Sequence, residues 1–171
     1  MVRSLYLSLD NASYQTKVRL TAGLLAGFIS ALSIIVVVTA GLVLTGSDIW
    51  TAARLIATSL FGDTAAGGGW LAVILGTLIH LLTGTLFGGL FAAFVPRLPA
   101  NVYVVAGILY GLLVWIVMGL VVLPVSARLL VASSGNLIML LFAHVIYGFV
   151  LGIAAGVIEL MVAQPKAAIS E

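Results

Sequence analysis

Four long apolar runs constrain the fold of this 171-residue chain more than any other feature. They lie near residues 18–44, 70–95, 102–123 and 137–162, and none carries a Lys or Arg in its central part. A helix needs about 20 residues to cross a bilayer. Because the hydrocarbon layer offers no water, backbone groups must pair within each segment, as they do in a helix. The sequence therefore predicts an all-α integral membrane four-helix bundle.

The composition supports this fold class and excludes several functions. Charged residues make up only 7% of the chain and hydrophobic residues 63%, whereas a soluble domain carries about 25% charged residues. The chain has no cysteine, which excludes a disulfide framework, a thiolate metal site and a thiol nucleophile. A net charge of +2 gives no reason to expect nucleic-acid binding.

The basic residues divide unequally between the two sides of the predicted bundle. Two of them, Arg54 and Arg128, follow the first and third spans, and the other five share the side of the termini and the middle loop: Arg3, Lys17, Arg19, Arg97 and Lys166. An excess of Lys and Arg marks the cytoplasmic side. We therefore expect a multi-pass protein of the bacterial inner (plasma) membrane, with cytoplasmic ends at 1–17 and 163–171.

Three sequence features recur in the same order in the two halves of the chain. Residues 18–27 (VRLTAGLLAG) align with residues 102–111 (VYVVAGILYG), and an Ala-Arg-Leu triplet follows each, at 53–55 and 127–129. A helix with the pattern His-x3-Gly-x3-Gly then closes each half. This shared order predicts two tandem helix–loop–helix repeats, 18–95 and 102–162, related by an axis along the membrane normal.

The outer loops are longer than simple turns and carry their own helical pattern. Ser47 and Asp48 are suitable N-cap residues, and apolar residues follow at helical spacing up to Leu60. The pattern predicts a short amphipathic helix near 48–60 that lies on the outer membrane surface. A shorter equivalent is expected at 126–132 in the second loop.

Glycines recur at four-residue spacing within every predicted span. Four residues are slightly more than one helical turn, so each set forms a groove on one helix face, where another backbone can approach closely. We expect these grooves to pack the four helices together, and some to face lipid or a partner. The glycines concerned are Gly23, Gly27, Gly84, Gly88, Gly107, Gly111, Gly148, Gly152 and Gly156.

The chain has two histidines, His80 and His144, and both lie in apolar surroundings. An imidazole within a bilayer needs partners for its nitrogens. In one interpretation each ring bonds across helices to Thr83, Thr85, Tyr110, Tyr147 or a carbonyl. In a second, one or both ligate a haem or (bacterio)chlorophyll-type ring. In a third, the pair acts as a proton relay, although the single carboxylate within a span, Glu159, sits near the inner end and is expected to pair with Lys166 or Arg97.

No set of residues indicates catalysis or a metal site. The chain lacks a phosphate-binding Gly loop, a zinc motif and a Ser-His-Asp set at one depth, so an enzyme is not expected. Elimination favours a non-catalytic accessory or structural subunit of a larger, possibly bioenergetic, membrane complex. Its expected partners are the lipid bilayer and other membrane subunits or copies of itself, and no nucleic acid.

Two other functions stay open at this stage. The first is a tetrapyrrole-binding electron- or excitation-transfer protein that uses His80 and His144. The second is a small homo-oligomeric transporter or channel, whose path would be lined by hydroxyl side chains: Thr21, Ser30, Ser33, Thr77, Thr83 or Thr85.

Overall fold

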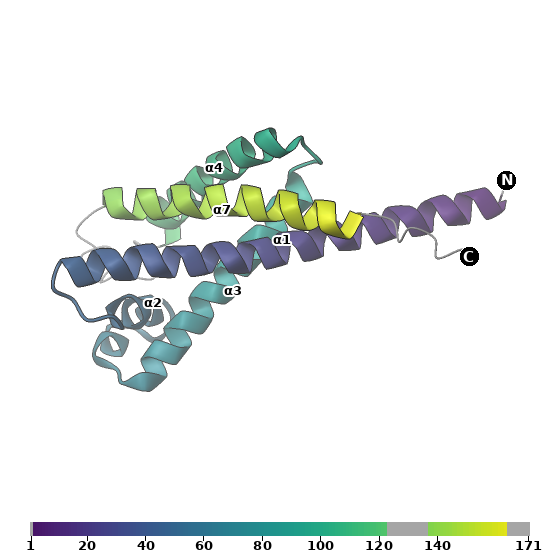
Figure 1. Ribbon diagram of the computed structural model, residues 1–171. Coiled ribbons are helices and arrows are strands. Elements are labelled where there is room, and N and C mark those ends of the chain that lie inside the picture. The colour runs from purple at the N-terminus through teal and green to yellow at the C-terminus, as the bar shows by residue number, and fades with distance from the viewer. Residues whose placement is uncertain (1, 123–136, 164–171) are drawn as a thin grey trace, which may run out of the picture.

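A computed structural model describes the fold of residues 2–122 and 137–163, and the side chains of 13–99, 101–120 and 138–161. Four long helices dominate it (Figure 1): α1 (Val2–Leu44), α3 (Trp70–Phe94), α4 (Ala100–Val117) and α7 (Leu137–Ala163). A π-helical turn, η2 (Met118–Val122), continues α4, and the first outer loop holds α2 (Thr51–Phe61) and the 3-10 turn η1 (Asp63–Gly67). The described residues contain no strand.

Each long helix contains a segment long and apolar enough to cross a membrane. These segments are Ser13–Leu44, Trp70–Phe94, Asn101–Leu120 and Ile138–Met161. The prediction of an all-α membrane bundle is confirmed, and the protein is a multi-pass membrane protein. The bounds of α3 and α7 agree with the predicted spans to within one residue.

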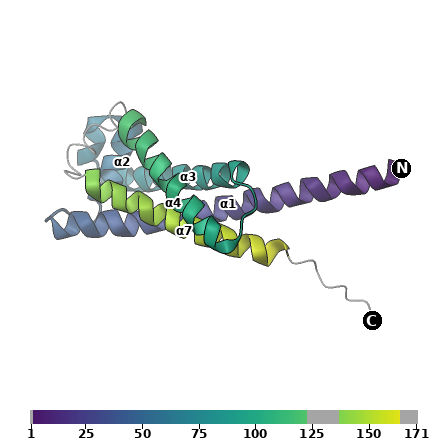
Figure 2. The ribbon, with the colours of Figure 1, turned by 90° about the horizontal axis from the view of Figure 1, so that it is seen from above.

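Helix α1 is much longer than the first predicted span. It begins at Val2 rather than near residue 18, because neither Gly nor Pro interrupts the chain before Gly23. Its N-terminal part extends beyond the other helices in both ribbon views (Figures 1 and 2). The opening segment, for which the sequence indicated no conformation, is thus a continuation of the first membrane helix.

The four long helices form two pairs that meet along one line of contact. Helix α1 packs against α3, α4 packs against α7, and the pairs join where α1 lies along α7. The backbones of α3 and α4, which Val95–Pro99 connect, lie apart for most of their length. The two helices meet through side chains, such as the rings of Phe91 and Tyr110, whose centroids are 5.3 Å apart. In Figure 1 the two helices run apart from the end at which they are connected. Helix α2 packs against α3.

Close approach of glycines holds each pair together. In the α1–α3 seam, a Cβ atom added at Gly27 would lie 2.8 Å from the Cα atom of Gly88. In the α4–α7 seam, one added at Gly152 would lie 2.8 Å from the Cα atom of Val104. Real Cβ atoms do not come so near to backbone, so only glycine permits these crossings. The repeat hypothesis requires such equivalent seams, and it stays a prediction.

The nine predicted groove glycines are all buried between helices. Eight of them meet backbone or a neighbouring side chain at less than contact distance, and Gly156 lies 3.8 Å from the ring of Tyr103, an ordinary contact. None of the nine therefore presents a groove to lipid or to a partner. The small-residue stripes are used within the chain itself.

Helix α2 packs against the bundle instead of lying free on its outer surface. It begins at Thr51, and its N-cap residue Trp50 makes no side-chain cap bond. The predicted cap residue Asp48 instead accepts a hydrogen bond from the Trp50 N–H at 2.6 Å. Ala52, Leu55, Ala57 and Thr58 are buried, because Gly76 lets α3 approach the α2 backbone at Ala53. The second loop helix predicted at 126–132 lies outside the described residues.

Candidate functional site

A cluster of polar side chains ties all four helices together at the end of the bundle where α3 ends and α4 begins, which is the predicted inner end. Glu159 on α7 accepts hydrogen bonds from Arg97 Nε at 2.6 Å and from the Tyr103 hydroxyl at 2.5 Å. Arg19 Nε on α1 lies 3.7 Å from the same carboxylate. Of the two partners predicted for Glu159, Arg97 is confirmed, and Lys166 lies outside the described residues. We call Arg19, Arg97, Tyr103 and Glu159 the inner cluster.

Arg19 also donates hydrogen bonds to carbonyl oxygens at the C-terminal end of α3. Its Nη2 atom donates to the carbonyl oxygens of Ala92 and Val95, at 2.7 and 2.6 Å. The last carbonyls of a helix lack intrahelical partners and carry partial negative charge, so an arginine there is favourable. Arg97 donates in addition to Gln15 on α1. The carboxylate and both guanidinium groups therefore all have hydrogen-bond or ion-pair partners.

The inner cluster leaves almost no room for a ligand. The cavity beside it, next to Gly23 and Phe91, measures about 10 Å³, which is at the lower limit for one water molecule. Side chains that satisfy one another in so small a space hold helices in place. We interpret the inner cluster as a structural lock.

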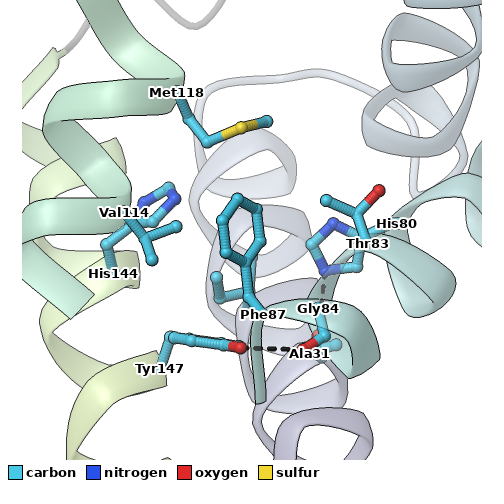
Figure 3. Close-up of a pocket in the computed structure, with 10 residues that line it drawn as sticks. Ala31, His80, Thr83, Gly84, Phe87, Val114, Met118, His144 and Tyr147 are labelled. Carbon is cyan, nitrogen blue, oxygen red and sulfur yellow. Dashed lines mark hydrogen bonds between the residues drawn. The ribbon is translucent and has the colours of Figure 1, made fainter. Parts of the chain in front are cut away.

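The two histidines lie further along the bundle, on different helices. His80 is on α3 and His144 is on α7, and the same two adjoining cavities touch both rings. Figure 3 shows the rings on opposite sides of the smaller cavity, with the Phe87 ring between them and Met118 nearby. The structure therefore brings together the two residues that the sequence singled out.

Backbone carbonyls fix one nitrogen of each imidazole. His80 Nε2 lies 3.0 Å from the Ala31 carbonyl oxygen on α1, and His144 Nδ1 lies 2.7 Å from the Leu140 oxygen in its own helix. A carbonyl oxygen only accepts, so each of these nitrogens carries the hydrogen. In the neutral ring, His80 Nδ1 and His144 Nε2 then hold a lone pair.

Neither lone-pair nitrogen has a partner among the described residues. Among the described residues, Trp115 Nε1 is the single side-chain nitrogen or oxygen that is fully buried and has no hydrogen-bond partner. The free nitrogens of His80 and His144 are thus unpaired but not fully buried, and both residues line the cavities described above. In this respect they differ from the engaged groups of the inner cluster.

Three of the four hydroxyl groups predicted as histidine partners bond elsewhere, and Thr83 has no hydrogen bond to either histidine among the described residues. Tyr147 donates to the carbonyl oxygen of Gly84 and Tyr110 to that of Phe87, each at 2.8 Å. These bonds join α7 and α4 to α3. Thr85 donates to Leu81 in its own helix. Carbonyl groups, which the prediction also allowed, are the partners that the histidines have.

The larger cavity measures about 520 Å³ and is enclosed by α1, α2, α3 and α7. Its walls are mostly apolar, with residues such as Ile34, Val38, Ile56 and Leu140, and its polar groups are few. The smaller cavity, of about 60 Å³, extends from it between α3, α4 and α7. The two share six lining residues: Ile34, His80, Thr83, Phe87, Met118 and His144. A cavity of several hundred Å³ with few polar groups has the size and character of a small-molecule site.

Phe87, Met118 and helix α2 are parts of this site that the sequence interpretation missed. Phe87 was detectable, because it follows His80 by seven residues and Thr83 by four and so shares their helix face. Met118 begins the π-helical turn η2, a distortion that is frequent at functional sites. No sequence signal indicated that α2 would form a wall of the cavity.

The geometry does not fit one haem held between the two histidines. The Phe87 ring and Met118 occupy the space between the imidazoles, and the cavity there is only about 60 Å³. His80 Nε2 is bound to Ala31. His144 alone retains the arrangement of an axial ligand, with Nδ1–H on a carbonyl and Nε2 free.

Within the single chain, the hydroxyl groups of the predicted solute path do not all line one cavity. Of its six residues, Thr77 and Thr83 line the large cavity. Thr21 is exposed on the outside of α1. Ser30 and Ser33 donate to carbonyls of their own helix, as Thr85 does.

The comparison with known families agrees with this extent of the fold. The pattern of the family of unknown function DUF6789 matches residues 18–166. The chain belongs to this family. The match begins at Val18, so it includes most of the first membrane segment, the other three segments and both histidines, whereas the N-terminal extension of α1 precedes it. No curated protein and no solved structure matches the chain.

Proposed function

We propose that this DUF6789 member is a non-catalytic accessory subunit of a larger membrane assembly. The observation that supports this most directly is the extension of α1. At about 1.5 Å per residue, a helix of 43 residues is about 65 Å long, roughly twice the thickness of the bilayer core. The predicted span begins near residue 18, and α1 runs back from there to Val2. Its N-terminal part, which includes residues 2–12, extends beyond the other helices in both ribbon views (Figures 1 and 2).

A helix end of this kind suits a contact with another chain. No other described helix runs beside residues 2–12 in either ribbon view. Most of the stability of a helix in a protein comes from packing against other elements rather than from helix propensity. A partner that packs along this segment would supply the missing stabilisation. In our proposal the segment lies in the cytoplasm of a bacterium, and bioenergetic complexes are suitable hosts.

The two rival functions have weaker support. A single shared tetrapyrrole lacks space between the histidines, and a solute path lacks a continuous set of hydroxyl groups. The inner cluster also closes the inner end, where the cavity is only about 10 Å³. The tandem-repeat origin of the two helix pairs is part of the proposal, because their glycine seams are equivalent.

Purification from the native membrane in mild detergent tests the subunit assignment. We expect tagged full-length protein to carry other chains in fixed stoichiometry, and a variant lacking residues 2–12 to lose them. Gly67→Ala is a matched control, because a Cβ atom there meets nothing within 4 Å, and it should retain the partners. Recovery of the full-length chain alone, or only with copies of itself, would contradict the proposal.

Orientation can be measured separately, because the chain has no cysteine of its own. Single cysteines at Tyr14 and at Phe61 occupy exposed positions at opposite ends of the bundle. We expect a membrane-impermeant thiol reagent added to intact bacterial spheroplasts to label the second and not the first. The reverse pattern would overturn the predicted orientation.

A further inference from the structure

We propose that the cavity of about 520 Å³ beside His80 and His144 binds a membrane-soluble phenolic compound, with a hydroquinone as the best-matched class. This site is independent of the subunit assignment, since none of its lining residues lies in the α1 extension. The proposal depends on three properties of the cavity: the hydrogen-bonding capacity of the two imidazoles, the character of the walls, and the available volume.

The two imidazoles favour a ligand that donates hydrogen bonds. Because Ala31 and Leu140 fix the N–H groups, each ring offers its remaining nitrogen as an acceptor. A ligand with acceptors only, such as a quinone or an ester, would leave these lone pairs facing other lone pairs. A hydroxyl group donates to such a nitrogen. A hydroquinone carries one hydroxyl at each end of its ring, and the two acceptors come from different helices.

The walls favour an apolar ring over a hydrated molecule. Ile34, Val38, Ile56 and Leu140 belong to the lining, and Phe87 offers an aromatic face between the histidines. Aromatic rings pair favourably with such a face. The volume lies within the range of about 300–1,000 Å³ that is usual for small-molecule sites. A ring with methyl groups or a short apolar chain would occupy it.

A metal ion is a poorer match for the same two nitrogens. Metal sites in proteins draw on three or four ligands, and the described residues contain no group of three His, Cys, Asp or Glu that could hold one. A buried hydroxyl–imidazole pair needs no further ligand. The cavity therefore favours a ligand whose hydroxyl groups donate hydrogen bonds to the histidines.

Equilibrium dialysis of the protein in lipid nanodiscs tests the proposal, with binding to empty nanodiscs subtracted. The probe is durohydroquinone, kept reduced with ascorbate, and its dimethyl ether is the matched ligand without donors. We expect the ether to bind at least tenfold more weakly, equivalent to about 1.4 kcal/mol, because it leaves both imidazole acceptors without a donor and buried groups without their hydrogen bonds are costly. This ligand comparison uses the unaltered protein and needs no variant.

Variants then assign the acceptors. His80→Phe and His144→Phe should each weaken durohydroquinone binding by about tenfold and reduce its preference over the ether. Leu109→Phe is the matched control, because this side chain is exposed on the outside of α4, and it should bind as the unaltered protein does. Thr77→Trp, which places a large ring in the cavity, should abolish binding of both compounds.

Three results would overturn the proposal. One is equal binding of the hydroquinone and its ether. Another is hydroquinone binding that neither histidine substitution changes. The third is a tetrapyrrole absorption band in protein from the native membrane that disappears in His144→Phe, since a ring on His144 would occupy the acceptor. The subunit proposal fails by other outcomes, namely the absence of partner chains, so the two are separable.

Discussion

The inner cluster and the histidine cavity differ in how far their buried polar groups are hydrogen-bonded and in how much space surrounds them. Around Glu159, carboxylate, phenol and guanidinium groups satisfy one another, and the space left is about 10 Å³. Around His80 and His144, one nitrogen of each ring is bound and the other borders about 520 Å³ of cavity. Unpaired polar groups are costly in lipid. A network whose polar groups bond to one another therefore indicates a structural role. Two histidines that each keep an unpaired nitrogen beside a cavity, an open pair, indicate a ligand site.

The largest effect is expected from opening the closed network. Glu159→Ala removes the shared acceptor of Arg97 and Tyr103 and leaves Arg19 without its carboxylate. We expect the free energy of unfolding to fall by about 3 kcal/mol, since breaking one side of a buried charge pair costs about 3–5 kcal/mol and Arg97 is half exposed. Unfolding by a denaturing detergent in mixed micelles measures it.

Glu159→Gln is the control for this experiment. It keeps an acceptor for the Tyr103 hydroxyl, so its loss should be smaller than that of Glu159→Ala. A loss below about 1 kcal/mol in the alanine variant, the value of an exposed pair, would show that the inner cluster is not a lock, and the contrast with the histidines would disappear.

The second largest effect on stability is expected at the glycine seams, where glycines of two helices face each other. Substitutions there test helix packing without changing any polar side chain. Gly88→Ala places a methyl group against the backbone of Gly23 and Gly27. We expect a loss of about 2 kcal/mol, within the range of 1–3 kcal/mol for overpacking. Gly156→Ala, whose methyl group would lie 3.8 Å from Tyr103, is the matched control and should be neutral or slightly stabilising. Equal effects of the two substitutions would refute the close-approach account.

The tyrosine bonds between the helix pairs should contribute less. Tyr147→Phe removes the hydroxyl that donates to Gly84 across α7 and α3. We expect about 1 kcal/mol or less, since interhelical hydrogen bonds in membranes average about 0.6 kcal/mol. The same detergent unfolding assay measures it. A loss above that of Gly88→Ala would mean that polar bonds, and not the seams, dominate helix association.

The histidine substitutions should have the smallest effect on stability. His80→Phe loses a bond between α3 and α1, whereas His144→Phe loses only a bond within α7. We expect losses of about 0.6 kcal/mol for the first and less for the second. Destabilisation of either variant as large as that of Glu159→Ala would place the histidines with the structural groups.

The sequence predicted the parts of this fold that depend on length and spacing. Apolar runs located α3 and α7, and four-residue glycine spacing marked the stripes along which helices cross. The sequence did not predict which stripes would meet, because that depends on pairing in space. It also did not predict that α2 would pack against α3, since a short amphipathic pattern does not reveal whether lipid or protein covers its apolar face.

The site could be predicted in part for the same reason. His80 and His144 stood out as the two imidazoles in apolar runs, and Glu159 stood out as the carboxylate of a span. Their partners include backbone carbonyls at Ala31 and Leu140, which every residue has and which no side-chain pattern marks. The cavity itself lies where α1, α2, α3 and α7 meet, and its position depends on how these helices pair in space.

The most direct test of the open-pair account is nitrogen NMR on histidine-labelled protein in lipid bilayers. With two histidines in the chain, His80→Phe and His144→Phe assign each signal. We predict two neutral rings of opposite tautomer, with the proton on Nε2 in His80 and on Nδ1 in His144, and a shift of both unprotonated nitrogens on addition of durohydroquinone but not of its dimethyl ether. Two rings of the same tautomer, a charged imidazole, or unprotonated nitrogens that do not respond to the hydroquinone would contradict it.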